Sequence, residues 1–332
     1  MNEVVAIDVG YGNTKFCAAD NGTLKTGHFP SIATLQVGVA DRGAVDLSNR
    51  ELITVIAGND SFRVGPDAID TLSAHEDRNR NLAKNYVETQ QHLALLRGAL
   101  HYLGKTKVDL LVTGLPVNDY AHHKKRMADK LRGLHAFPKA DPIQVHEVLV
   151  IPQPMGGFVN YFMGTNQIGA LKAIKSLTID IGYFTVDWLV CRGLKMQEER
   201  CGSVPGGMSM ILDRLKHLIS EDRQTAFSDI NLIDAGIQNG FKTRLNGQDY
   251  DFSHLAPKIN SHIRNIMQSV LSSVGSLDDI DLIVMVGGGA PIYKETAQEV
   301  LNHRDITVPE NSLYANVMGF YITGFQRMTS RQ

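Results

Sequence analysis

A glycine-rich stretch near the N-terminus joins one acidic and one basic side chain at a spacing that suits phosphate and metal chemistry. Asp8 stands where an apolar run, residues 4–7, ends, and Lys15 follows seven positions later. Gly10 and Gly12 lie between them and let backbone N–H groups approach an anion without a Cβ in the way. Asp8 can hold a hydrated cation, and Lys15 can act as a point charge for phosphate. An ordinary hairpin with an aspartate capping its turn fits the same residues.

A second copy of the pattern favours the functional interpretation. Residues 178–187 repeat the order of strand, Asp-x-Gly-Tyr and strand, so that Asp180 aligns with Asp8. Each copy continues as a β-meander, and in the second copy the pattern predicts a strand over residues 194–204 after the turn at 192–193. Two related halves, each with an aspartate and a glycine turn, predict a clamp for one polyphosphate and its metal.

Composition places the chain among ordinary globular proteins. Its 332 residues are enough for two domains with their own cores, and 43% are hydrophobic while 20% are charged. The net charge of −2 gives no sign of direct nucleic-acid binding. No apolar run approaches the ~20 residues that span a bilayer, and no signal peptide is predicted. The three cysteines, Cys17, Cys191 and Cys201, have no metal-binding spacing and suit a reducing cytoplasm.

Five segments, in the same order along the chain, resemble the sequence landmarks of the actin-like ATPase superfamily. They correspond to the first phosphate loop, the first connecting segment, the second phosphate loop, the adenosine segment and the second connecting segment. Within the superfamily, the Tyr-Gly-Asn-Thr-Lys form of the first loop most resembles the plasmid-segregation actins of bacteria (the ParM/StbA group) and their archaeal relatives. The five segments are residues 8–15, 151–157, 180–187, 284–291 and 315–319.

The resemblance implies an α/β chain with the actin-like fold, in which two duplicated RNase-H-like domains surround a nucleotide cleft. Domain I is expected to comprise residues 1–160 together with 312–332, and to carry a small outer subdomain around residues 31–86. Domain II is expected to comprise residues 161–311. The polar run at residues 76–81 would lie on the outer subdomain.

The resemblance also assigns roles to individual residues. Gln153 matches the position that orients the attacking water, and because an amide takes no proton at neutral pH, it would act through hydrogen bonds. Asp180 would hold Mg²⁺ opposite Asp8, with both carboxylates acting through water. Thr185 can donate to a phosphate oxygen, whereas Asp187 could equally be paired within its sheet.

The remaining nucleotide contacts are expected at glycine turns and on one helix. Gly206 and Gly207 precede a helix whose first N–H groups suit phosphate or ribose. Asp213 and Lys216 on that helix are candidates for ribose and base, as family members use this helix there. Three glycines after the buried strand at 281–286 would lie against the adenosine. The expected nucleotide-binding residues are Gly10, Tyr11, Gly12, Asn13, Lys15, Gly182, Tyr183, Thr185, Gly206, Gly207, Asp213, Lys216, Gly287, Gly288 and Gly289.

Two helical features bear on assembly. Asn118 is a predicted N-cap for a basic helix over residues 119–131, whose charges suit a solvated face or a contact with a neighbouring subunit better than nucleic acid. Gly156 and Gly157 would let the first connecting helix pack closely between the halves, and Ala315 and Gly319, four apart on one face, would allow a close helix crossing near the hinge. Tyr11 departs from eukaryotic actin, which has a serine there, so backbone N–H groups must carry more of the γ-phosphate contact.

The implied function is that of a cytoplasmic, polymerising ATPase. Plasmid-segregation actins form head-to-tail filaments with ATP and Mg²⁺, and they move DNA through a separate DNA-binding adaptor at a centromere-like site. ATP is expected, with GTP left open. A small-molecule kinase of the sugar- or acetate-kinase type is one alternative, but it would need a carboxylate base where this chain has Gln153. A chaperone-like ATPase would need a further domain after the last helix, and a non-polymerising nucleotide switch is the third alternative.

Overall fold

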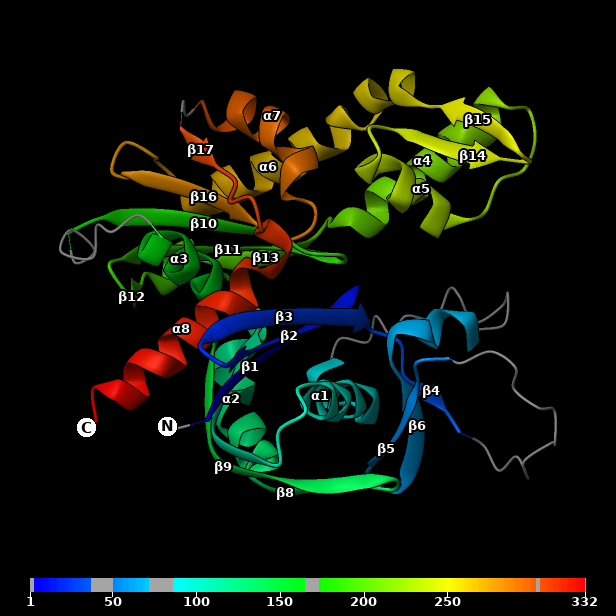
Figure 1. Cartoon of the computed structure of the whole chain (residues 1–332). Coiled ribbons are helices and arrows are strands. Elements are labelled where there is room, and N and C mark those ends of the chain that lie inside the picture. The colour runs from blue at the N-terminus through cyan, green and yellow to red at the C-terminus, as the bar shows by residue number, and fades with distance from the viewer. Residues whose placement is uncertain (1–2, 37–49, 72–85, 165–172, 303–304, 332) are drawn as a thin grey trace. The chain divides into compact units, whose positions relative to one another are not determined.

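The chain divides into two compact units, each with its own sheet and core. The computed structural model describes residues 3–36, 50–71, 86–164, 173–302 and 305–331. The first unit comprises Met1–Lys172 and Pro309–Gln332, and the second comprises Ala173–Val308. In Figure 1 the second unit is coloured from green to orange, and the first contains both ends of the colour scale.

The first unit is built on a six-stranded sheet with the order β3-β2-β1-β7-β9-β8. The first three strands form the predicted meander, and β1, which is buried along its whole length, pairs parallel with β7 on its other side. Such a strand reads as a continuous apolar run because both faces of the sheet are covered. The strands are β1 (Val4–Val9), β2 (Asn13–Asp20), β3 (Thr23–Pro30), β7 (Lys107–Leu115), β8 (Gly133–Phe137) and β9 (Ala140–Pro152).

Helices of the first unit pack on this sheet (Figure 1). The C-terminal helix α8 contacts β1, β2 and β7, α1 contacts β1 and β2, and α2 contacts β9. The predicted cap at Asn118 is wrong, because the helix begins at Val117, two residues earlier than predicted, and Pro116 takes the N-cap position. The helices are α1 (Gln90–Tyr102), α2 (Val117–Leu131), α3 (Gln153–Gly164) and α8 (Ala315–Thr329), with 3₁₀ turns at Pro66–Thr71, Tyr86–Glu88 and Ser312–Tyr314.

A small antiparallel sheet belongs to the segment that was expected to form the outer subdomain. Its order is β4-β6-β5. Val55 and Phe62 are buried, so the sheet has an apolar side. The polar run at 76–81 lies outside the described residues. The strands are β4 (Thr34–Leu35), β5 (Ile53–Ala57) and β6 (Asp60–Val64).

The second unit repeats the meander and the parallel strand. Its sheet has the order β12-β11-β10-β16-β17, and β13 also pairs with β11. A hairpin, β14–β15, was not expected from the sequence. The strands are β10 (Lys175–Ile181), β11 (Thr185–Arg192), β12 (Lys195–Met196), β13 (Gly202–Pro205), β14 (Lys242–Leu245), β15 (Gln248–Asp251), β16 (Leu282–Val286) and β17 (Ile306–Thr307). The helices are α4 (Met208–Asp222), α5 (Ile230–Gln238), α6 (Asn260–Val274) and α7 (Ala290–Leu301), with a 3₁₀ turn at Ser253–Lys258.

The strand predicted over residues 194–204 is wrong, because a 3₁₀ turn at Glu198–Arg200 divides it into β12 and β13. The turn coincides with long-range contacts of Arg200. Its Nε donates to the carbonyl of Val274 at 2.8 Å, and its guanidinium donates to Asp279 at 2.9 Å. The arginine therefore fastens the meander to the end of α6, a contact that no local pattern encodes.

The duplication seen in the sequence extends to the pairing of the strands. Asp8 lies opposite Lys15 between β1 and β2, and Asp180 lies opposite Asp187 between β10 and β11. In each copy the glycine two residues after the aspartate donates its N–H to a carbonyl across the turn, at 3.2 Å in the first copy and 3.0 Å in the second. Each residue of the second turn lies 172 positions after its counterpart.

The close helix crossing predicted at Gly319 is present, and its partner is α3, so the crossing joins α3 and α8 within the first unit. A Cβ placed on Gly319 would lie 1.8 Å from the carbonyl oxygen of Gly156. Asn316 Oδ1 accepts a hydrogen bond from the N–H of Gly157 at 3.1 Å. The crossing thus depends on the absence of a side chain at position 319.

Replacing Gly319 with alanine is expected to destabilise the protein by about 3 kcal/mol, because the helices must move apart to admit the methyl group. Urea unfolding measures the effect. The matched control is Gly164→Ala at the other end of α3, where a Cβ would meet no atom within 4 Å of the described structure. Equal stability of the two variants would contradict the crossing.

Candidate functional site

Three residues singled out from the sequence meet beside the first glycine turn. Asp8, at the end of β1, is only 1% exposed. Its Oδ2 accepts a hydrogen bond from Lys15 Nζ at 3.2 Å, and its Oδ1 accepts one from Gln153 Nε2 at 2.8 Å. Lys15 comes from the neighbouring strand β2, and Gln153 is the first residue of α3, directly after β9. A carboxylate, an ammonium and an amide are therefore held together at one end of the sheet.

The ion pair between Asp8 and Lys15 is buried, so water screens the interaction between the two charges only weakly. The Asp8 side chain is 2% exposed and that of Lys15 is 13% exposed, so the pair is shielded from water. Removing one partner of a buried ion pair leaves an uncompensated charge, which is strongly destabilising. Lys15 can therefore neutralise Asp8 and attract an anion at the same position.

The donor set fits a hydrated magnesium ion better than a cation fully ligated by protein. Mg²⁺ is usually bound by one or two carboxylates together with waters and substrate phosphates. Asp8 offers one carboxylate, and among the residues that the structure describes no group of three or more His, Cys, Asp or Glu side chains is placed to hold a metal. An all-protein cage is thus absent from that part of the chain.

Tyr11, in the first turn, packs against its own unit. Its ring stacks on Tyr86 with 4.6 Å between centroids, and Tyr86 in turn meets the edge of His92 at 5.2 Å. The aromatic series connects the turn to the buried face of α1. The neighbours of Tyr11 could not be predicted, because residues 86 and 92 are far away in the sequence.

Acidification is expected to weaken the fold through His92. Burial, with a smaller contribution from the charge of Lys130, lowers the pKa of His92 to about 3 from 6.5. The unfolded chain binds this proton below about pH 6.5 and the folded chain does not, so stability falls as the pH drops through that window, by at most about 1.4 kcal/mol per pH unit. Urea midpoints between pH 7 and pH 5 measure the slope. The slope should be shallower in His92→Gln, and an unchanged slope would contradict this role.

The second glycine turn holds its own polar pair. Thr185 Oγ1 donates to Asp187 Oδ2 at 2.6 Å, and Asp187 is 4% exposed. The hydroxyl that was expected to donate to phosphate thus donates within the sheet in this structure. Asp180, opposite Asp187 in the register, is 8% exposed. The acidic character of this turn contrasts with the first, where Lys15 takes the equivalent place.

The turn at Gly206 and Gly207 packs directly on the second glycine turn. Both N–H groups donate to the carbonyl of Phe184, at 3.1 and 3.0 Å, and the N–H of Met208 donates to the carbonyl of Gly182 at 3.0 Å. A Cβ on Gly207 would lie 2.5 Å from the Gly182 oxygen. In this structure the N–H groups of these two glycines bind the second glycine turn, and their expected contact with a nucleotide stays a prediction.

The three-glycine turn after β16 lies against the same region of the second unit. Gly287 has a φ of +88°, and a Cβ there would meet Asp180 Oδ1 at 2.5 Å and the carbonyl of Ile181 at 2.4 Å. The N–H of Gly289 donates to the same carbonyl at 3.1 Å. The structure thereby places the expected adenosine segment beside Asp180.

The two charged candidates on α4 pair with each other. Lys216 Nζ forms an ion pair with Asp213, and His217 Nε2 lies 3.6 Å from the same carboxylate. The hydrogen bond from Lys216 keeps the pKa of Asp213 below its usual value. Their contacts are those of a surface helix, and they stay candidates for ribose or base.

Sequence reasoning missed two groups that surround the first turn. Ser31, just after β3, bonds to the turn itself. His28, opposite Lys15 in the register, has its Nδ1 2.6 Å from the hydroxyl of Tyr314. Burial, and then the charge of Lys15, lower the pKa of His28. The alternation along β3 could have placed His28 next to Lys15, but the contact with residue 314 has no local signal.

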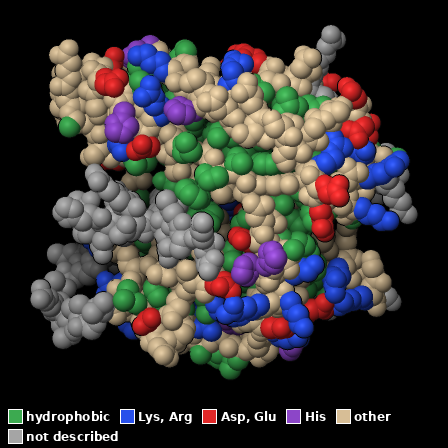
Figure 2. All heavy atoms as spheres, turned by 180° about the vertical axis from the view of Figure 1, so that it is seen from behind, with side chains coloured by type: hydrophobic (Ala, Val, Ile, Leu, Met, Phe, Trp, Pro, Cys, Tyr) green, Lys and Arg blue, Asp and Glu red, His purple; other side chains and the backbone are tan. Residues whose placement is uncertain are grey.

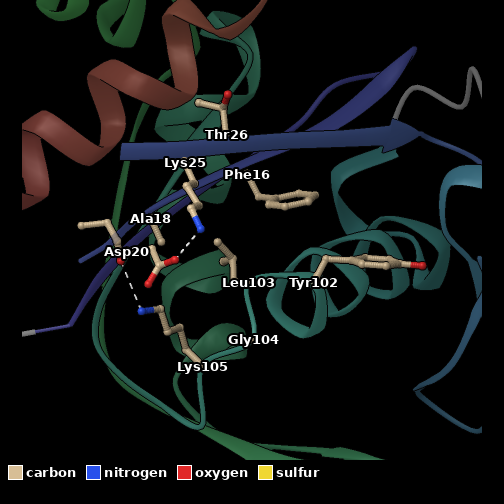
Figure 3. A pocket seen from close by; sticks show the side chains of 10 residues that line it. Phe16, Ala18, Asp20, Lys25, Thr26, Tyr102, Leu103, Gly104 and Lys105 are labelled. Atoms are coloured by element: carbon tan, nitrogen blue, oxygen red, sulfur yellow. Dashed lines mark hydrogen bonds and ion pairs between the residues drawn. The ribbon is translucent and has the colours of Figure 1, made fainter. Parts of the chain in front are cut away.

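A cavity of about 440 Å³ lies at the other end of the β2–β3 hairpin and is not part of this site. Figure 3 shows Lys25 directed at Asp20, 2.5 Å away, and Lys105 directed at the carbonyl of Ala19, 3.2 Å away. Lys105 also pairs with Glu3 at 3.1 Å. The charged groups that line the cavity thus already have partners, and the cavity lies at the end of β2 opposite the glycine turn.

The basic helix α2 presents its charges to solvent. Lys124, Lys125 and Arg126 are exposed, and Glu88 pairs with Arg126 and lies 3.4 Å from His123. Figure 2 shows a face of the molecule on which Lys, Arg and His side chains lie among Asp and Glu side chains. The expectation of a solvated helix face or a subunit contact stays a prediction.

Comparisons with known proteins agree with this architecture. The model of the actin like proteins N terminal domain matches residues 6–156, and that of the archaeal actin homologue MreB-like C-terminal domain matches residues 178–299. A search of curated proteins finds no match.

Solved structures with a similar fold include archaeal and plasmid actins. Ta0583, an archaeal actin homologue in complex with ADP, is 17% identical with a TM-score of 0.74, over 98% of this chain and 99% of that one. A 15-stranded ParM filament from Clostridium botulinum is 19% identical with a TM-score of 0.73, over 98% and 100%. A non-polymerisable quadruple mutant of pCBH ParM is 20% identical with a TM-score of 0.74, again over 98% and 100%. At these identities the likeness shows the fold.

None of the helices that the structure describes is both long and apolar enough to cross a membrane.

The two family models follow one another along the chain and fall in the two units of the fold. The chain therefore belongs to the actin-like proteins and has their two-domain fold, with an actin-like N-terminal domain and an MreB-like C-terminal domain.

Proposed function

We propose that this protein binds ATP with Mg²⁺, hydrolyses it, and uses the hydrolysis to control a filament of its own copies. The observation that carries the proposal is the meeting of Asp8, Lys15 and Gln153 beside a glycine turn. These groups supply one metal-facing carboxylate, one phosphate-facing cation and one amide that can orient water. Phosphoryl transfer needs little more from a protein than such positioning and charge neutralisation.

In the proposed reaction, Gln153 positions the attacking water. Its Nε2 donates to Asp8, which fixes the side chain and makes Oε1 the atom that accepts a hydrogen bond from the water. Lys15 attracts the phosphate groups, and Asp8 orients the waters around the cation. Bound Mg²⁺ supplies neutralisation of the charge on the phosphate oxygens.

We propose that the second unit also contributes nucleotide-binding residues. Asp180 would hold the hydrated metal ion, and Gly182, Tyr183 and Thr185 would contact phosphates. The turn at Gly287–Gly289 would lie against the adenosine, with Asp213 and Lys216 as candidates for ribose and base. Support comes from the nearness of Gly287 to Asp180, since a Cβ added to Gly287 would lie 2.5 Å from Asp180 Oδ1, so the residues proposed for metal and for adenosine are neighbours within one unit.

The biological role that we propose is DNA segregation through a separate adaptor protein. Support comes from the fold, which is shared with ParM, including a ParM solved as a filament. Head-to-tail contacts that do not close give filaments. A kinase of small molecules is disfavoured by the amide at Gln153, which cannot act as the base that an acceptor hydroxyl requires.

Lys15→Gln is expected to weaken ATP binding about 30-fold, because it removes a charged phosphate contact while keeping an N–H donor beside Asp8. Fluorescence titration with a labelled ATP analogue measures the affinity, and competition with GTP tests the base preference. Lys25→Gln is the control, since Lys25 is an exposed partner of Asp20 on the next strand. Equal affinity of both variants would contradict the role of Lys15.

A further inference from the structure

The first glycine turn is held in shape by one side chain from outside it. Ser31 follows β3 and is 8% exposed. Its Oγ donates to the carbonyl of Gly10 at 2.6 Å, and its N–H donates to the carbonyl of Gly12 at 2.9 Å. Two of the turn's carbonyl groups are thus bound by the same residue.

The hydroxyl of Thr14 determines in which direction the hydroxyl of Ser31 donates its hydrogen bond. Thr14 Oγ1, on a residue that is 0% exposed, lies 2.9 Å from Ser31 Oγ. A hydroxyl has only one proton, and that of Ser31 goes to Gly10, so Thr14 must be the donor in this bond. The result is a directed series from Thr14 through Ser31 to the carbonyl of Gly10, all of it within the first unit.

In the second unit, backbone N–H groups bind the carbonyls of the equivalent turn. The carbonyls of Gly182 and Phe184 lie 172 positions after those of Gly10 and Gly12. They accept from the N–H groups of Met208 and Gly206, at 3.0 and 3.1 Å. Both turns therefore have these two carbonyls bound by outside donors. One of the two donors at the first turn is a hydroxyl, which a single substitution can remove.

The carbonyl directions matter for an anion. A carbonyl oxygen carries partial negative charge and repels phosphate, whereas successive N–H groups attract it. We propose that Ser31 is the positioning residue of the first phosphate loop. It holds the carbonyls of Gly10 and Gly12 away from the triphosphate, so that the N–H side of the loop faces it. This inference rests on the proposed nucleotide-binding function.

The test compares two ligands that differ only in phosphate. In Ser31→Ala the affinity for MgATP should fall about tenfold, the effect of losing one buried hydrogen bond, while the affinity for adenosine stays unchanged. Ser31→Thr, which keeps the hydroxyl, should recover most of the MgATP affinity. Competition titrations against a labelled adenosine analogue give both constants. Thr26→Ala is the control, since it removes an exposed hydroxyl from the middle of β3, where Thr26 pairs with Cys17 and not with a residue of the turn.

Each outcome separates this inference from the proposed function. If the wild-type protein binds no nucleotide, the proposed function fails and the role of Ser31 fails with it. If wild type binds MgATP and Ser31→Ala binds it equally well, only the role of Ser31 is overturned. An equal loss of MgATP and adenosine affinity would also overturn it, because general damage would then explain the change. Should Ser31→Ala not fold, Thr14→Val must weaken MgATP about threefold and leave adenosine unchanged, and any other result overturns the inference.

Discussion

Asp8→Asn is expected to reduce ATP hydrolysis by about 100- to 1,000-fold while the protein stays folded. The substitution keeps the size of the side chain and an oxygen that can accept from Lys15 or Gln153. It removes the negative charge, and with it the group that would orient the waters of the metal ion. Phosphate release with saturating ATP and Mg²⁺ measures the effect, and circular dichroism checks the fold.

Asp20→Asn is the matched control for this experiment. Asp20 lies on the same hairpin, at the other end of β2, and pairs with a lysine as Asp8 does, but its side chain is 44% exposed. Exposed ion pairs contribute little, so hydrolysis should be unchanged within about twofold. Normal phosphate release by the Asp8 variant would rule out Asp8 as the metal-facing group.

Gln153→Ala is expected to slow phosphate release about 100-fold and to change ATP affinity by less than about threefold. Gln153 would contact the attacking water and not the nucleotide, and Asp8 keeps its bond to Lys15 when the amide is lost, so the loss affects the reaction much more than binding. Filaments formed by this variant should scatter light for longer, because the nucleotide inside them stays unhydrolysed. Stopped-flow phosphate detection and right-angle light scattering measure the two effects in one sample.

Gln153→Glu tests the kinase alternative at the same position. Gln153 Nε2 lies 2.8 Å from Asp8 Oδ1, so a glutamate would place a second carboxylate against Asp8. Two carboxylates at such a distance repel, and one of them is pushed towards the protonated form. Hydrolysis should therefore fall in this variant too. A gain of transfer to an acceptor hydroxyl would instead favour a kinase.

The parts of the site that could be predicted are those encoded by short patterns. A buried strand, two glycines and a second strand specify a hairpin, and the alternation of side chains places Lys15 opposite Asp8. The repeat 172 residues later specifies the same register in the second unit. Gln153 was found only through resemblance, since a glutamine after a strand carries no chemical signal by itself.

The features that could not be predicted depend on contacts between distant residues. Ser31 contacts the turn from 21 positions away in the sequence, and the Arg200 contact with Asp279 spans 79 positions. The N–H groups of the glycines at 206 and 207 bind the carbonyl of Phe184, a contact that their position before a helix does not predict. A pattern identifies residues that can donate, and only the fold decides which acceptor they meet.

A filament controlled by ATP hydrolysis can be observed by right-angle light scattering of the purified protein after addition of ATP and Mg²⁺, with phosphate release followed in the same sample. We expect a rise in scattering that decays as phosphate accumulates. Phosphate release with flat scattering over a wide range of protein concentration would contradict the filament, and the chain would then be a nucleotide switch or a chaperone-like ATPase. Absence of both signals would contradict the ATPase itself and lead to a screen for kinase acceptors.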